Sequence, residues 1–210
     1  MPVLFETHYH PPIAFFGELI GNQTLWLETQ EHYRKQTYRN RCLILTAQGV
    51  KPLTVPVIDG NRSEKVLINA VEIDYRQNWI HQHWRTLQTA YGGTPYFEYY
   101  ADYLHDIYVQ KPRLLFDLNL AFLRFYLRCL RLPLSLQLTT EYLPSYPSFL
   151  PHVPTASVLD RRDWLTPKTA EPDRKSGKSY RQTFGKDFVP GLSILDLLFM
   201  QGPAAGSFLT

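Results

Sequence analysis

The chain has 210 residues, of which 44% are hydrophobic and 14% aromatic, so it can bury a core of its own. Its formal net charge is only +3, which argues against nucleic-acid binding because phosphate backbones require clustered cations. No apolar run approaches about 18 residues, which argues against a membrane-spanning helix, and no signal peptide is evident. Cys42 and Cys129 lie in apolar surroundings, so we expect reduced thiols in a soluble, cytoplasmic protein.

Residues 1–28 predict a strand–helix–strand unit. Pro2–Phe5 is an apolar strand, and the prolines at 11 and 12 end it and precede a helix over Ile13–Ile20. Gly21 ends this helix, and Thr24–Leu27 is a second apolar strand. Two strands joined through one helix are expected to be parallel neighbours.

A β-hairpin is expected next. Its strands are Cys42–Leu45 and Leu53–Val57, and Gly49 supplies the turn in the connection between them. Val66–Ile73 alternates imperfectly between apolar and polar residues and predicts one further strand.

The second half of the chain is expected to be largely helical. Three helices are predicted, over Trp79–Tyr91, Tyr96–Tyr108 and Arg113–Leu130. Leu134–Leu138 alternates and predicts a strand. Ser193 is a suitable N-cap for a last helix over Ile194–Met200, which must dock on the domain because it is too hydrophobic for solvent.

The fold class that these elements predict is α/β. We expect a single domain over residues 1–210, with a small, partly parallel sheet, a β-hairpin, a helical second half and a docked C-terminal helix. Residues from about 144 to 179 are rich in proline and polar side chains, and Glu171–Lys178 contains no apolar residue. Part of this segment is therefore expected to be mobile.

The most polar stretch, Glu28–Arg41, lies between two predicted strands and has no glycine or proline. Its cations are suited to a phosphate or carboxylate, with a carboxylate to balance them and amide and phenol groups to direct hydrogen bonds. The residues predicted to line such a pocket are Glu31, Tyr33, Lys35, Gln36, Arg39, Asn40 and Arg41. The alternative is a helix on which Glu31 and Lys35, four residues apart, form only a solvated surface pair.

Two histidine-containing motifs are further candidates. His8-Tyr9-His10 lies where the first strand meets the first helix, a position at which α/β proteins bind ligands, so a ligand-facing histidine is one interpretation and plain surface placement is the other. A metal site is not predicted, because no third ligand lies nearby. Trp79 and His83 are helical neighbours that either face a sugar ring or base, or belong to the core.

Common catalytic motifs are absent. The sequence has no P-loop, G-x-G-x-x-G, G-x-S-x-G, H-E-x-x-H or C-x-x-C motif, which argues against the usual nucleotide hydrolases, dinucleotide enzymes and serine hydrolases. No cofactor is identified.

Several blocks of sequence together resemble the WbqC-like family. They are Tyr9–Phe16, Glu31–Arg41, Leu53–Val57, Ala90–Tyr91, Thr94–Tyr100, Asp117–Asn119, Ser193–Phe199 and Gly202–Pro203. The resemblance spans almost the whole chain except Thr155–Lys178, and it implies a bacterial protein connected with O-antigen or other surface polysaccharides. The family supplies no established catalytic residues.

Two functions are therefore expected. The first is a transferase that modifies an activated sugar, for example with an acyl or aminoacyl group, in which Glu31 or His10 moves the proton and Tyr9, Trp79 or His83 contacts the substrate. The second is a non-catalytic binding or assembly protein that uses the same pocket. Both imply an anionic small-molecule partner. Nucleic-acid binding through Arg161-Arg162 and the run Arg174–Lys178 is disfavoured, because a solvated, mobile segment explains those charges.

Overall fold

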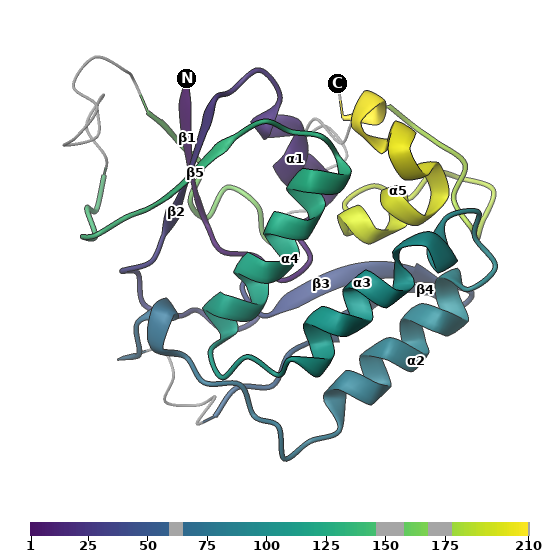
Figure 1. Ribbon diagram of the computed structural model, residues 1–210, viewed down its shortest axis with the longest axis horizontal. Coiled ribbons are helices and arrows are strands. Elements are labelled where there is room, and N and C mark those ends of the chain that lie inside the picture. Colours follow the sequence, from purple (N-terminus) through teal and green to yellow (C-terminus); the bar gives the residue numbers. More distant parts are fainter. Residues whose placement is uncertain (59–64, 146–157, 168–177, 210) are drawn as a thin grey trace.

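The computed structural model describes residues 1–58, 65–145, 158–167 and 178–209. Its fold is mixed α/β, with helices and strands interspersed along the chain (Figure 1). The elements are β1 (Pro2–Glu6), α1 (Ile13–Leu19), β2 (Thr24–Glu28), β3 (Arg41–Thr46), β4 (Gly49–Thr54), the 3-10 helix η2 (Ile68–Ala70), α2 (Trp79–Tyr91), α3 (Phe97–Val109), α4 (Leu115–Cys129), β5 (Ser135–Leu138), β6 (Leu159–Asp160), α5 (Ile194–Gln201) and the 3-10 helix η3 (Gly202–Phe208). In the described part of the chain, no helix has both the length and the apolar character needed to cross a membrane.

The main sheet has the strand order β5-β2-β1-β6, and all its pairs are parallel. β1 and β2 pair in register from Pro2 with Thr24 to Glu6 with Glu28, which confirms the predicted strand–helix–strand unit. Every residue of β1 is buried, as expected for the interior strand of a parallel sheet that is covered on both faces.

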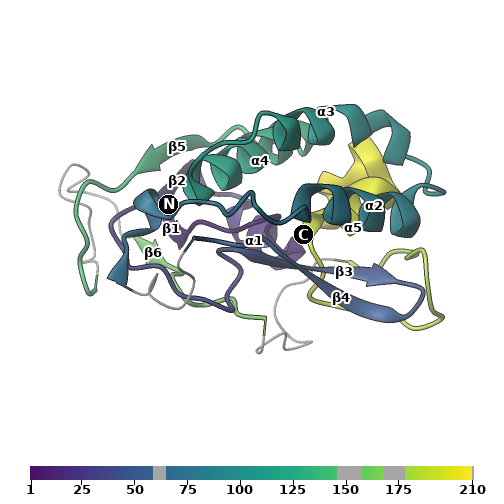
Figure 2. The ribbon, with the colours of Figure 1, turned by 90° about the horizontal axis from the view of Figure 1, so that it is seen from below.

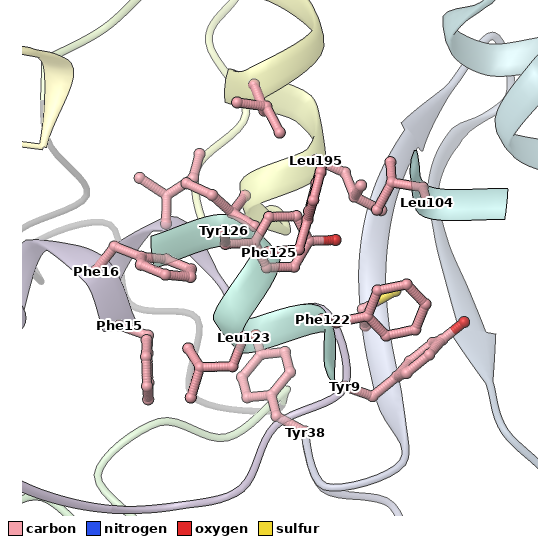
Figure 3. Packing of buried hydrophobic residues seen from close by; sticks show 14 of the residues in the cluster. Tyr9, Phe15, Phe16, Tyr38, Leu104, Phe122, Leu123, Phe125, Tyr126 and Leu195 are labelled. Atoms are coloured by element: carbon pink, nitrogen blue, oxygen red, sulfur yellow. The ribbon is translucent and has the colours of Figure 1, made fainter. Parts of the chain in front are cut away.

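The core forms where α1 and α4 pack together beside the sheet (Figure 1). Phe16 of α1 meets Tyr126 of α4 edge to face, with ring centroids 6.0 Å apart. Figure 3 shows Phe15, Phe16, Phe122 and Tyr126 among the aromatic side chains that fill this space, with Tyr9 entering it from the loop after β1. Aromatic rings of this size bury much apolar surface, so this interface is a major source of stability.

The hairpin and the segment after it differ from the prediction. β4 begins at Gly49, four residues before the predicted strand Leu53–Val57 begins, and ends at Thr54, three residues before that strand ends; only Ala47 and Gln48 connect it to β3. The predicted strand Val66–Ile73 is wrong: η2 and isolated bridges occupy it. Its backbone groups bond to other segments, for example Ile68 N–H to Glu31 O and Leu115 N–H to Val71 O, so no continuous ladder forms.

The docked C-terminal helix is confirmed. Leu195, Leu197, Leu198 and Phe199 of α5 are fully buried, and the Ser193 side chain caps the helix by accepting from Leu195 N–H. The predicted mobility of Glu171–Lys178 lies outside the described residues apart from Lys178. The proline-rich passage contributes β6 to the edge of the sheet, a strand that the sequence pattern did not predict.

Candidate functional site at the carboxyl edge of the parallel sheet

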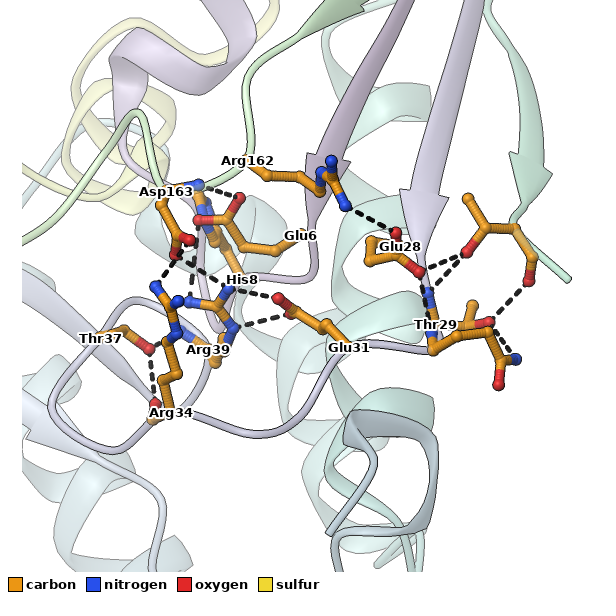
Figure 4. A network of polar contacts seen from close by, with 12 residues as sticks. Glu6, His8, Glu28, Thr29, Glu31, Arg34, Thr37, Arg39, Arg162 and Asp163 are labelled. Atoms are coloured by element: carbon orange, nitrogen blue, oxygen red, sulfur yellow. Dashed lines mark hydrogen bonds and ion pairs between the residues drawn. The ribbon is translucent and has the colours of Figure 1, made fainter. Parts of the chain in front are cut away.

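Polar side chains gather where the parallel strands end. Glu6 ends β1, Glu28 ends β2, Thr139 follows β5, and residues 161–163 follow β6. The carboxyl ends of parallel strands meet at one edge, and open α/β sheets bind their ligands outside that edge. The position of these residues therefore defines the candidate site (Figure 4).

Glu6 and His8 form a buried acid–base pair within this site. His8 Nε2 donates to Glu6 Oε1 at 2.9 Å, and Glu6 Oε2 accepts from the backbone N–H of Asp163 at 3.0 Å. Burial alone would raise the pKa of Glu6, but His8 and Arg39 outweigh it and hold that pKa below its usual value. Since an ionised carboxylate only accepts, His8 carries its proton on Nε2. Its other nitrogen, Nδ1, is buried and has no hydrogen-bond partner among the described residues.

Arg39 is the cationic centre of the site, and its side chain is only 1% exposed. Its Nε and Nη2 donate to the two carboxylate oxygens of Glu31 at 2.7 and 2.5 Å, and Nη2 also reaches Asp163 at 3.1 Å (Figure 4). Burial opposes the charge of Arg39, but Glu31 and Glu6 raise its pKa. Burial raises the pKa of Glu31, and the hydrogen bonds from Arg39 limit that rise.

Asp163 joins this buried pair to the surface. Its carboxylate binds Arg34 at 2.7 Å on one oxygen and Arg39 at 3.1 Å on the other. The Arg34 and Asp163 side chains are 62% and 40% exposed, so this outer contact is open to solvent. A carboxylate held between two guanidinium groups occupies the kind of position that a ligand phosphate or carboxylate prefers.

Glu28 anchors a second group of hydrogen bonds at the same edge. Its Oε1 accepts from the Thr139 hydroxyl at 2.7 Å and from the Gln30 N–H at 2.9 Å, and its Oε2 accepts from Arg162 at 3.2 Å. Arg162 also pairs with Asp160 and lies 5.1 Å from the centre of the Tyr142 ring. These contacts tie the ends of β2, β5 and β6 together beside the Glu6–His8 pair.

The catalytic candidate His10 lies in a different environment, a buried chain of hydrogen-bonded rings. We call it the tyrosine–histidine chain; in order, its members are Tyr126, His10, Tyr108, Tyr9 and His83. Tyr126 O–H donates to His10 Nδ1 at 2.5 Å and His10 Nε2 donates to Tyr108 at 2.6 Å. Tyr108 then bonds to Tyr9 at 2.6 Å, and Tyr9 bonds to His83 Nδ1 at 2.8 Å.

The donor and the acceptor of each hydrogen bond in this chain follow from the bonds that His83 makes at its end. His83 makes a further hydrogen bond to the Thr54 backbone, and since a carbonyl only accepts, its remaining nitrogen must accept from Tyr9. Burial lowers the pKa of His83 to about 4, and burial and the nearby His83 lower that of His10. Both imidazoles are therefore neutral at pH 7, and both nitrogens of His10 are already occupied.

The other predicted site residues are dispersed. Lys35 and Gln36 are exposed, and Arg41 is half-buried with its Nε on the Thr54 hydroxyl. Residues 31–40 are not helical, so the alternative i,i+4 surface pair is wrong and Glu31 binds Arg39 instead. Three more are buried away from solvent, namely Tyr33, Asn40, whose Nδ2 donates to Val55 O, and Trp79, which stacks on Tyr75.

Metal coordination finds no support in the described residues, which contain no group of three or more His, Cys, Asp and Glu side chains suited to an ion. Cys42 is buried and Cys129 half-buried, and both are free thiols. Burial raises the pKa of Cys129 to about 11, so it is not a reactive thiolate at neutral pH.

Comparison with known proteins agrees with the resemblance in the sequence. The sequence model of the WbqC-like protein family matches residues 7–172 and 168–208. The chain belongs to the WbqC-like protein family. It is 29% identical over 229 aligned residues to the uncharacterized protein Rv1507c of Mycobacterium tuberculosis, an alignment that covers 98% of this chain and 96% of the relative. No solved structure matches the chain.

Sequence reasoning missed several members of the site in this WbqC-like protein. The sequence pattern does not predict Glu6, Glu28 or Asp163 as site residues, and it offers Arg162 only as a nucleic-acid contact. A signal was present for the first two, because each is an acid that directly ends an apolar strand. No comparable pattern marked Asp163, which follows a two-residue strand within a polar passage.

Proposed function

We propose that this protein is a cytoplasmic enzyme of activated-sugar metabolism, as used in surface-polysaccharide (O-antigen) synthesis, and that it transfers an acyl or aminoacyl group to a nucleotide-linked sugar. Membership of the WbqC-like family motivates the sugar substrate. The observation that supports catalysis is the buried Glu6–His8 pair, in which the carboxylate holds one imidazole nitrogen and leaves Nδ1 without a partner among the described residues.

His8 is suited to the role of general base. A carboxylate that accepts from one imidazole nitrogen orients the ring and stabilises the imidazolium that forms when the other nitrogen takes a proton. In the proposed transfer, His8 Nδ1 accepts a proton from the amine or hydroxyl of the sugar while that nitrogen or oxygen bonds to the acyl carbon. The bond between the acyl carbon and its leaving group breaks, and the leaving group departs with the electron pair.

Arg39 and Arg34 are suited to binding the anionic part of the substrate. Asp163 now lies between them, at 3.1 and 2.7 Å, and is the most exposed of the carboxylates that pair with Arg39. A phosphate or carboxylate of the substrate would replace Asp163 there, while Glu31 keeps Arg39 in place. This retains Glu31 and Arg39 from the sequence prediction, but places the proton transfer on His8 rather than on Glu31 or His10.

The experiment is a mass-spectrometric assay of the full chain with nucleotide-linked amino sugars and acyl or aminoacyl donors. We expect an acylated nucleotide sugar from the wild type and a loss of about 100-fold or more in kcat for His8→Gln, since general-base catalysis contributes on that scale. The matched control is His81→Gln, because His81 is an exposed histidine on α2, and it should retain full activity. Circular dichroism would verify that His8→Gln is folded.

Arg34→Gln provides a test that does not disturb buried groups. It should raise KM for the nucleotide sugar and leave kcat unchanged, because Arg34 would contact the anion and not the reacting atoms. Turnover that is unaffected by His8→Gln, or no product with any donor and sugar in the panel, would reject the proposed reaction.

A binding or assembly protein is the second candidate function. The observation that favours it is that the carboxylates of Glu31 and Asp163 already occupy the guanidinium of Arg39, an arrangement that also serves a purely structural or binding role. Nucleotide sugars that raise the melting temperature of the wild type and of His8→Gln alike, without any turnover, would support this alternative.

A further inference from the structure

Two adjoining hollows lie on the outer side of the α3–α4 pair, away from the carboxyl edge of the sheet. The larger, with a volume of about 750 Å³, is lined by residues of α3, α4 and the start of β5. Figure 2 shows the ribbons of these three elements on the same side of the molecule. The apolar lining of this larger hollow includes Ile107, Leu127, Leu132, Leu134 and Leu136. This volume lies within the range of small-molecule sites, which are mostly apolar with a few polar groups.

Three arginines, Arg124, Arg128 and Arg131, surround this apolar floor. All three are exposed, and none forms an ion pair with any acid in the described part of the chain. Six other described arginines pair with carboxylates, namely Arg34, Arg39, Arg76, Arg113, Arg161 and Arg162, whereas Arg41, Arg85 and Arg181 form no ion pair with a described acid. The negative end of the α4 helix dipole favours cations and accounts for the positions of Arg128 and Arg131. It does not account for Arg124, which lies in the interior of the helix.

The smaller hollow, of about 320 Å³, shares two of these arginines. Arg128 and Arg131 line it together with Tyr99 and Tyr103 of α3 and Phe125 of α4. The two tyrosines are 64% and 62% exposed, although large aromatic side chains are usually buried, and the Tyr103 ring stacks on Phe125 at 6.4 Å. Apolar surface therefore continues on both sides of the arginine pair.

We propose that these hollows form a binding site for a phosphate or diphosphate ester of a hydrophobic alcohol. Arg128 and Arg131, which line both hollows, bind the phosphate, because a guanidinium donates two parallel hydrogen bonds to phosphate oxygens. The hydrocarbon chain lies on Leu127, Leu134 and Leu136. Charge complementarity selects an anion, and the leucine floor selects one with an apolar chain.

This site is separate from the one at the carboxyl edge of the sheet. Leu134 and Leu136, at the start of β5, line the hollow, whereas Thr139, beyond the end of β5, binds Glu28. The proposal therefore does not depend on the proposed enzymatic activity. It can fail or succeed while His8 is tested independently.

The test is calorimetric titration of the full chain with octyl phosphate below its micelle concentration. Wild type should bind it, and the double variant Arg128→Gln/Arg131→Gln should bind at least about tenfold more weakly, since charge-assisted hydrogen bonds to both arginines are lost. Arg85→Gln is the matched control, because Arg85 is an exposed helical arginine on α2 and its removal changes the net charge in the same direction. Its affinity should equal that of the wild type.

Four further probes define the chemistry: inorganic phosphate, octyl glucoside, a nucleoside diphosphate and phospholipid vesicles. Inorganic phosphate and octyl glucoside should each bind at least about tenfold more weakly than octyl phosphate, because each lacks one half of the recognised group. Vesicles with and without anionic phospholipid distinguish a lipid surface from a single molecule. Equal affinity of wild type and double variant, equal binding of inorganic phosphate, preference for a nucleoside diphosphate, or binding only to anionic vesicles would each overturn the proposal.

Discussion

His8 and His10 are two residues apart, yet they lie in two regions with opposite chemistry. His8 belongs to the strand-end cluster of Glu6, Glu31, Arg39 and Asp163, where charges are concentrated and one imidazole nitrogen is unpartnered among the described residues. His10 belongs to the tyrosine–histidine chain, where uncharged groups satisfy one another from Tyr126 to His83.

The difference shows that a buried histidine can either keep a ring nitrogen without a hydrogen-bond partner or have both nitrogens bonded. In the strand-end cluster, Arg39 pairs with several carboxylates, and His8 Nδ1 has no hydrogen-bond partner among the described residues. In the tyrosine–histidine chain, every ring nitrogen already has a partner, and burial keeps the histidines neutral. His10 also adopts a left-handed backbone with φ of 43°, which costs about 1–2 kcal/mol for a residue with a side chain. That conformation directs its ring into the core rather than toward the site.

The largest effect is expected from the cationic centre. Arg39→Met should lower the free energy of unfolding by about 3–5 kcal/mol, because it leaves Glu31 and Glu6 buried without their cation. The matched control, Arg34→Met, removes a mostly exposed ion pair and should cost less than about 1 kcal/mol. Urea unfolding measures both values, and similar costs would mean that Arg39 is not the buried centre of the cluster.

A pH effect should follow from the neutral histidines. The pKa of His83 is about 4 in the folded protein and about 6.5 in the unfolded chain, so between these values only the unfolded chain binds the proton. The contribution of neutral His83 to the free energy of unfolding is therefore complete above about pH 6.5. Below that value it declines by about 1.4 kcal/mol for each unit by which the pH falls.

His83→Gln isolates this contribution from other titrating groups. Unfolding in urea at pH 7.5, 6 and 5 should show a shallower loss of stability in the variant than in the wild type. Burial also raises the pKa of Asp196 and Glu31, which gives a dependence of opposite sign, and the comparison of the two proteins removes it. Parallel pH profiles of the two proteins would show that folding does not lower the pKa of His83.

The smallest effect concerns a single hydroxyl of the tyrosine–histidine chain. Tyr108→Phe should lower the free energy of unfolding by about 1–3 kcal/mol, since the His10 N–H then has no acceptor in the core. Tyr99→Phe, which removes a hydroxyl from a ring that is 64% exposed, should have almost no effect. If Tyr108→Phe also left the free energy of unfolding unchanged, the Tyr108 hydroxyl would not stabilise the folded protein.

The two regions were not equally predictable. Hydrophobic runs and helical periods located α2, α4 and α5 to within about two residues, because these patterns report which face of an element is buried. The block Glu28–Arg41 was predicted to line a pocket, and two of its residues, Glu31 and Arg39, do come together. Val66–Ile73 was assigned wrongly because its backbone groups bond to distant loops, and no local pattern reports such pairing.

The sequence alone determined that this chain is an α/β protein with a parallel strand pair and a buried last helix, because these features depend on local apolar patterning. Only the tertiary structure decided which polar residues form a site. Asp163 reaches Glu6 and Arg39 across more than a hundred residues of chain, and it does so because parallel strands end at one edge of the sheet. The same long-range packing separated His8 from His10, and in doing so it gave adjacent histidines different chemistry.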